Sequence, residues 1–111
     1  MPEMTDETKN MVMQFQTYQQ QLQSILIQKE SMKLQDLEIQ KALEELNATK
    51  QKTAYKITGS IMINKPVEEI KKELDENKEL VGVRIKSLEK TEEKLNDKLK
   101  ELQTKLKEVM K

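Results

Sequence analysis

Three adjacent pairs of carboxylates are the residues of this 111-residue sequence best suited to acid–base chemistry: Glu44–Glu45, Glu68–Glu69 and Glu92–Glu93. General acid–base catalysis needs two such groups to converge on one reacting centre. Neighbouring residues of a helix point in different directions, so these pairs cannot converge. We therefore predict that they are solvated surface groups.

Residue types that carry other chemistry are absent or scarce. The sequence has no Cys and no His, which excludes disulfides, thiolate nucleophiles, Cys/His zinc sites and imidazole bases. Its two glycines cannot build a phosphate-binding loop. We expect no enzyme activity, no catalytic residues, no cofactor and no bound metal.

Charge and hydropathy narrow the range of partners. Twenty basic and 20 acidic residues cancel, and no stripe of one sign is available to follow a phosphate backbone. No apolar run approaches the ~20 residues of a membrane span, and the N-terminus lacks the apolar core of a signal peptide. We expect no nucleic-acid partner, no membrane partner and a cytoplasmic location.

Heptad repeats predict two long helices, from about residue 5 to 50 and from about 66 to 110. Polar residues interrupt both seams at a positions. These residues are either tolerated through neighbouring charges, or they fix register and partner choice. The first seam runs Met11, Phe15, Tyr18, Leu22, Ile25, Met32, Ile39, Leu43 and Leu46, with Lys29 and Asp36 as its polar breaks. The second runs Leu74, Val81, Ile85, Leu88, Leu95, Leu99, Leu102, Leu106 and Val109, broken by Lys78 and Glu92.

The matched seams predict that the two helices pack as an antiparallel coiled coil. In that arrangement Phe15 lies level with either Leu102 or Val109, and the sequence leaves both registers open. Polar a residues are expected to face apolar d residues and to weaken the middle of the pair. Gly82 lies off the seam in the middle of the second helix and costs about 1 kcal/mol relative to Ala. Either a close contact or a slight bend would account for a glycine there, and the sequence leaves both open.

Residues 53–65 between the helices change to a period of two and are rich in β-branched side chains, which predicts a β-hairpin. Pairing Ile57 with Ile61 and Tyr55 with Ile63 leaves a three-residue loop around Gly59, which is free to adopt positive φ. All four large side chains then share one face. An isolated hairpin is marginal in water, so this face predicts association with other subunits.

Methionines concentrate at the free end of the predicted helix pair. Met11 and Met13 come from one helix and Met110 from the other, with Met1 and Met4 beyond. Flexible thioether side chains suit an adaptable binding surface. The alternative is an initiator methionine together with ordinary seam and end residues.

The hairpin Tyr55-Lys56-Ile57-Thr58-Gly59-Ser60-Ile61-Met62-Ile63 between two long helices resembles the archaeal-type prefoldin beta-subunit family. The helix segments 15–22, 41–46 and 84–90 are similar to the same family. The resemblance implies one domain over residues 1–111, in a hexamer of two alpha-type and four beta-type subunits. Its hairpins would form a β-barrel platform that carries coiled-coil arms.

The resemblance also implies a function. Such subunits hold non-native polypeptides at the coiled-coil tips without ATP and deliver them to a group II chaperonin. The rival hypothesis is a structural, tethering coiled coil. The expected assembly residues are Tyr55, Ile57, Gly59, Ile61 and Ile63. The expected client contacts are Met4, Met11, Val12, Met13, Phe15, Leu106, Val109 and Met110. The expected chaperonin contacts are Lys105, Lys107, Glu108 and Lys111.

Overall fold

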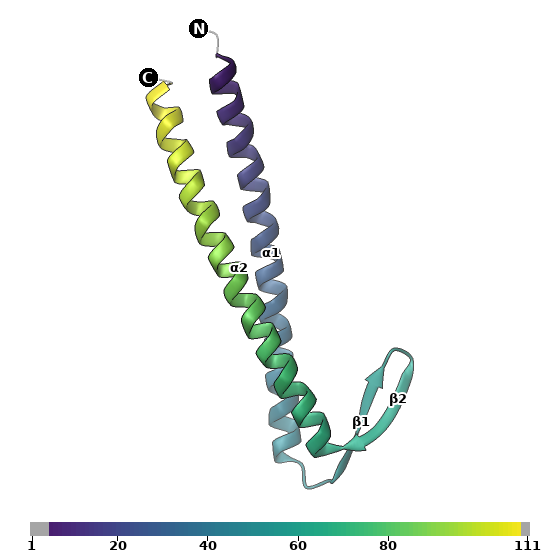
Figure 1. Ribbon diagram of the computed structural model, residues 1–111. Coiled ribbons are helices and arrows are strands. Elements are labelled where there is room, and N and C mark those ends of the chain that lie inside the picture. Colours follow the sequence, from purple (N-terminus) through teal and green to yellow (C-terminus); the bar gives the residue numbers. More distant parts are fainter. Residues whose placement is uncertain (1–4, 110–111) are drawn as a thin grey trace. The chain divides into compact units, whose positions relative to one another are not determined.

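The computed structural model describes residues 5–109, which form two long helices joined by one hairpin (Figure 1). Helix α1 spans Asp6–Ala48 and helix α2 spans Val67–Val109. Strands β1 (Thr53–Thr58) and β2 (Ile61–Pro66) lie between them. The predicted fold class, mainly α with a single β-hairpin, is confirmed.

Local signals explain where each helix begins. The backbone N–H of Thr8 donates to Thr5 Oγ1 at 3.1 Å, so Thr5 is the N-cap of α1. Acidic residues fill the first turn of both helices, where they oppose the positive end of the helix dipole. Pro66, expected in the first helical turn, instead ends β2 and pairs with Thr53.

The chain divides into two compact units. The hairpin unit comprises residues 31–85, and the terminal unit comprises the described parts of 1–30 and 86–111. In the terminal unit, the d-position side chains Leu88, Leu95 and Leu102 are buried. The predicted α1 seam residues of this unit, from Met11 to Lys29, are half-buried. The burial pattern therefore follows the predicted heptads.

The polar a residues pair with one another across the two helices. Lys29 binds Glu92 in the terminal unit, and Lys78 Nζ lies 2.9 Å from Asp36 Oδ1 in the hairpin unit. The expectation that these residues simply face apolar partners was wrong. Their side chains are long enough to reach the opposite charge one layer away, so each unit carries a cross-helix ion pair on its seam.

The hairpin unit selects one of the two registers. If the helices of the hairpin unit follow the first register, Lys78 lies level with residue 39, three residues or about 4.5 Å along the axis from Asp36. If they follow the second, the offset grows to ten residues or about 15 Å, beyond the reach of a lysine. Within this unit, the ion pair therefore requires the first register.

The terminal unit selects the same register independently. Lys98 Nζ lies 5.2 Å from the centre of the Tyr18 ring. Lys98 is level with residue 19 in the first register, and with residue 26 in the second, about 12 Å from Tyr18 along the axis. Phe15 therefore lies level with Leu102.

The hairpin register differs from the expected one by a single residue. Ile57 pairs with Met62 and Thr58 with Ile61, which leaves only Gly59 and Ser60 in the turn. Gly59 has φ 61° and no other described residue has positive φ, the pattern of a type II′ turn. Two residues that pair across the strands lie on the same face of the hairpin. The one-residue change in pairing therefore separates side chains that were expected on one face.

Gly82 is not needed for close packing. Apart from its two chain neighbours and the backbone of its own helix turns, no atom lies within 4 Å of the position that a Cβ at Gly82 would occupy. The close contact considered for this glycine is therefore absent.

Among the described residues, neither helix is long and apolar enough to cross a membrane.

Candidate functional site

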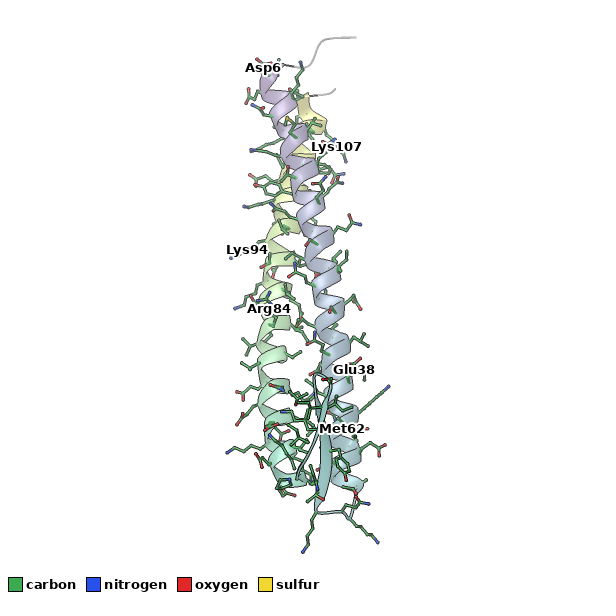
Figure 2. All side chains as sticks on the ribbon, turned by 90° about the vertical axis from the view of Figure 1, so that its right-hand side faces the viewer. Asp6, Glu38, Met62, Arg84, Lys94 and Lys107 are labelled. Carbon is green, nitrogen blue, oxygen red and sulfur yellow. The ribbon has the colours of Figure 1, made fainter. Side chains whose placement is uncertain are left out.

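One face of the hairpin is an uncovered apolar surface. Tyr55, Ile57 and Met62 lie on it and are 68%, 71% and 64% exposed. Ile57 and Met62 are direct cross-strand partners, and Met62 is labelled on the hairpin in Figure 2. We call Tyr55, Ile57 and Met62 the first hairpin face.

The second hairpin face is held partly against the start of α2. Lys56 of β1 and Lys65 of β2 lie 2.7 and 3.0 Å from the two carboxylate oxygens of Glu73. On the same face, Ile63, the cross-strand partner of Lys56, and Ile61, next to the turn, remain exposed. One carboxylate thus connects both strands to α2.

The ion pairs that join Lys56 and Lys65 to Glu73, which we call the Glu73 clamp, shift the pKa of Glu73 and that of Lys65. Hydrogen bonds from Lys56 and Lys65 hold the pKa of Glu73 below its usual range. The hydrogen bond to Glu73 raises the pKa of Lys65. The backbone N–H of Val67 also donates to the Lys52 carbonyl at 2.9 Å, which closes the base of the hairpin.

The structure divides the predicted assembly residues between the two faces. Tyr55 and Ile57 lie on the first face, Ile61 and Ile63 on the second, and Gly59 forms the turn. The expectation of one shared face was wrong because the loop has two residues instead of three. Sequence reasoning also missed Met62, although Gly-Ser between two β-rich runs is itself a signal for a two-residue turn.

The second candidate surface is the end of the terminal unit where α1 begins and α2 ends (Figure 1). We call it the open end. Met13 and Val109 are exposed there, at 63% and 53%. Val12 is half-buried, as are three seam residues of the predicted set: Met11, Phe15 and Leu106. Met4 and Met110 lie outside the described residues.

Two polar features complete the open end. Lys105, Lys107 and Glu108 are exposed, and Lys105 Nζ lies 3.6 Å from Glu101 in the preceding turn. Lys111 lies outside the described residues. Thr8, which the sequence reasoning did not select, is only 3% exposed and extends the seam one heptad beyond Phe15.

Two of the three carboxylate pairs supply ion-pair partners. Glu92 binds Lys29, Glu69 lies 3.8 Å from Lys65, and Glu68 lies 3.3 Å from Lys71. Among residues 5–109, no group of three acidic residues is close enough to hold a metal ion. What this part of the chain offers is apolar surface at the hairpin and the open end.

An antiparallel helix pair with an exposed hairpin between its helices is typical of a protein that associates with other subunits. Comparison with known proteins specifies the class. The family model described as "Prefoldin subunit" matches residues 9–111. The chain belongs to the prefoldin beta-subunit family, whose members are components of a chaperone and assemble with other prefoldin subunits.

Individual relatives cover nearly the whole chain. Prefoldin subunit beta of Archaeoglobus fulgidus is 37% identical over 99% of this chain and 96% of the relative. That of Thermococcus onnurineus is 39% identical over 90% of this chain and 87% of the relative. The crystal structure of the prefoldin beta subunit from Thermococcus strain KS-1 matches with a TM-score of 0.88 and 34% identity, covering 98% of this chain and 96% of that one.

Proposed function

We propose that the chain is a holdase subunit that binds non-native polypeptides at its open end, without ATP, and delivers them to a group II chaperonin. The observation that carries this proposal is the exposure of Met13 and Val109 at the open end of a chain from a chaperone family. Unfolded chains display apolar segments that such side chains can cover. The binding step needs no catalytic chemistry.

The hairpin supports assembly. Burying the first hairpin face requires apolar surface from other subunits, because a two-stranded hairpin cannot cover itself. We assign residues 1–111 to one domain of a cytoplasmic hexamer with two alpha-type and four beta-type subunits. In this assembly, Tyr55, Ile57 and Met62 line the barrel that the hairpins form. Ile61 and Ile63 contact residues outside that barrel.

Weak contact at each open end fits transfer of a client. Completing the burial of Met13 and Val109 contributes about 1–2 kcal/mol for each side chain. Together these contacts contribute about 2–4 kcal/mol, no more than the roughly 4 kcal/mol that corresponds to a millimolar dissociation constant. Several open ends acting on one client would supply the missing affinity by avidity, while each contact stays easy to release.

The charged side chains Lys105, Lys107 and Glu108 are the proposed chaperonin contacts, together with Lys111 beyond the described residues. Their exposure beside the open end supports this assignment. Contacts of this kind are screened by salt, so transfer to the chaperonin should slow as ionic strength rises. Surface plasmon resonance against an immobilised group II chaperonin measures this directly.

The decisive experiment replaces the exposed apolar side chains of the open end. The double variant Met13→Ser with Val109→Ser should assemble normally with the alpha-type subunit but lose most suppression of client aggregation, followed by light scattering. Leu80→Ser is the matched control, because Leu80 is exposed on α2 in the hairpin unit. Unchanged suppression by the double variant would favour a tethering role or a binding surface elsewhere.

A further inference from the structure

The outward side of α1 in the terminal unit differs chemically from that of α2. From Asn10 to Gln28, 19 consecutive residues of α1 carry no charge. From Lys86 to Glu108, every turn of α2 exposes charged side chains; Lys94 and Lys107 are labelled in Figure 2. We call the exposed side of α1 between Asn10 and Gln28 the neutral track.

Glutamine amides dominate the neutral track. Among residues 5–109, two side-chain hydrogen bonds lie on this track. Thr17 Oγ1 donates to the Met13 carbonyl, and Gln28 Nε2 donates to Ser24 Oγ. Six exposed amides make no side-chain hydrogen bond within the same described range, and each offers two donors and one acceptor. They belong to Gln14, Gln16, Gln19, Gln20, Gln21 and Gln23.

Apolar side chains lie at both ends of the neutral track. Met13 stands at one end, beside a groove of about 350 Å³ that Asn10, Gln14, Thr17 and Tyr18 also line. Ile27, 64% exposed, stands at the other end beside Leu26. Apolar anchors are thus separated by a stretch of amides.

This arrangement selects one kind of occupant. A second helix packs through a continuous apolar stripe at every third or fourth residue, which the track lacks between Met13 and Leu26. An extended chain instead presents unpaired backbone N–H and C=O groups, which side-chain amides can satisfy. The track is about 28 Å long, which matches eight or nine residues of extended chain.

Resting on the proposed holdase function, we propose that the neutral track binds an extended, uncharged segment of a non-native polypeptide, from the open end inward to Ile27. The charged outward side of α2 takes no part in this contact. Binding on the track should change little between about 0.05 and 0.5 M salt, because residues 10–28 themselves carry no charge. The substrate class is a low-charge, amide-satisfiable segment with apolar residues near its ends.

Photo-crosslinking of the full chain, assembled with its alpha-type subunit, tests the location. The crosslinker p-benzoylphenylalanine replaces Gln20 on the track or Asn96 on α2, both exposed. The probe is reduced, carboxamidomethylated α-lactalbumin, which stays unfolded in buffer. The proposal expects a crosslink to the probe at Gln20 and little at Asn96. Equal yields, a preference for Asn96, or a Gln20 crosslink to a second copy of this chain overturns it.

A charge insertion tests the chemistry. Gln16→Glu with Gln23→Glu places two carboxylates on the track, and affinity for the probe should fall at least about tenfold, because a carboxylate resists desolvation against an uncharged chain. Ser87→Glu with Gln103→Glu on α2 is the matched control and should bind like the unmodified chain. Circular dichroism verifies that both variants stay helical.

The outcomes separate the track from the general function. If the unmodified assembly binds the probe and the track variant binds it equally well, the neutral track is wrong and the holdase function stands. If the unmodified assembly neither binds the probe nor suppresses aggregation, the holdase function fails, and the track fails with it.

Discussion

The helix register can be tested with engineered disulfides, because the chain has no cysteine of its own. Phe15 lies level with Leu102, so Phe15→Cys with Leu102→Cys brings two thiols to the same layer of the terminal unit. A disulfide requires Cα atoms at most about 7 Å apart. Phe15→Cys with Val109→Cys is the matched control, since seven residues separate its thiols by about 10.5 Å along the axis alone.

Non-reducing gel electrophoresis after mild oxidation measures the outcome, since an internal disulfide makes the denatured chain migrate faster. The first pair should close within the chain and the second should not. Closing a loop of this length stabilises the fold by about 4–5 kcal/mol when the native geometry is unstrained, visible as a higher Tm. Efficient closure of the Val109 pair, with none for the Leu102 pair, would refute the register inferred from the Asp36–Lys78 and Tyr18–Lys98 contacts.

Four further outcomes follow from the same structure. Ile57→Asp should prevent assembly with the alpha-type subunit in light scattering while Ser60→Asp in the turn does not, and normal assembly of the first variant would disprove a buried first hairpin face. Leu95→Ala should lower the free energy of unfolding by about 2–3 kcal/mol, whereas exposed Leu80→Ala should change it by less than about 0.5 kcal/mol; equal losses in urea titrations would contradict the seam. Gly82→Ala should raise stability by up to about 1 kcal/mol, and a loss would reveal a constraint on that backbone. The depressed pKa of Glu73 means that its ion pairs stabilise the fold above about pH 4 and are lost as pH falls through the folded-state pKa; thermal melts against pH should show this loss in the unmodified chain and less of it in Glu73→Gln, and identical profiles would remove the clamp.

Much of the fold was predictable because its determinants are local. Heptad spacing marks the seam, and Leu88, Leu95 and Leu102 are buried where the spacing places them. The two helices and the hairpin follow from a change in hydrophobic period, which depends only on neighbouring residues. Helix register was not predictable in the same way, because shifting one helix by a heptad replaces each apolar contact with another apolar contact. Among residues 5–109, the cross-helix contacts of Lys78 and Lys98 are what separates the two registers.

For the hairpin, the sequence predicts the element itself but not which side chains share a face. Its existence and residues follow from β-branched alternation, but its faces depend on whether the turn holds two residues or three. A shift of one residue moved Met62 beside Ile57 and moved Ile61 and Ile63 to the other face. The neutral track was visible in the sequence as a run without charges, but its exposure along one side of α1 required the structure.

The most direct test of the account is the sedimentation of the full chain at micromolar concentration, alone and with an alpha-type prefoldin subunit. The exposed hairpin predicts species larger than one chain, and a defined complex once the partner is present. A stable, fully folded single chain that stays monomeric with every alpha-type partner tested would contradict the claim that the hairpin must be covered by other subunits.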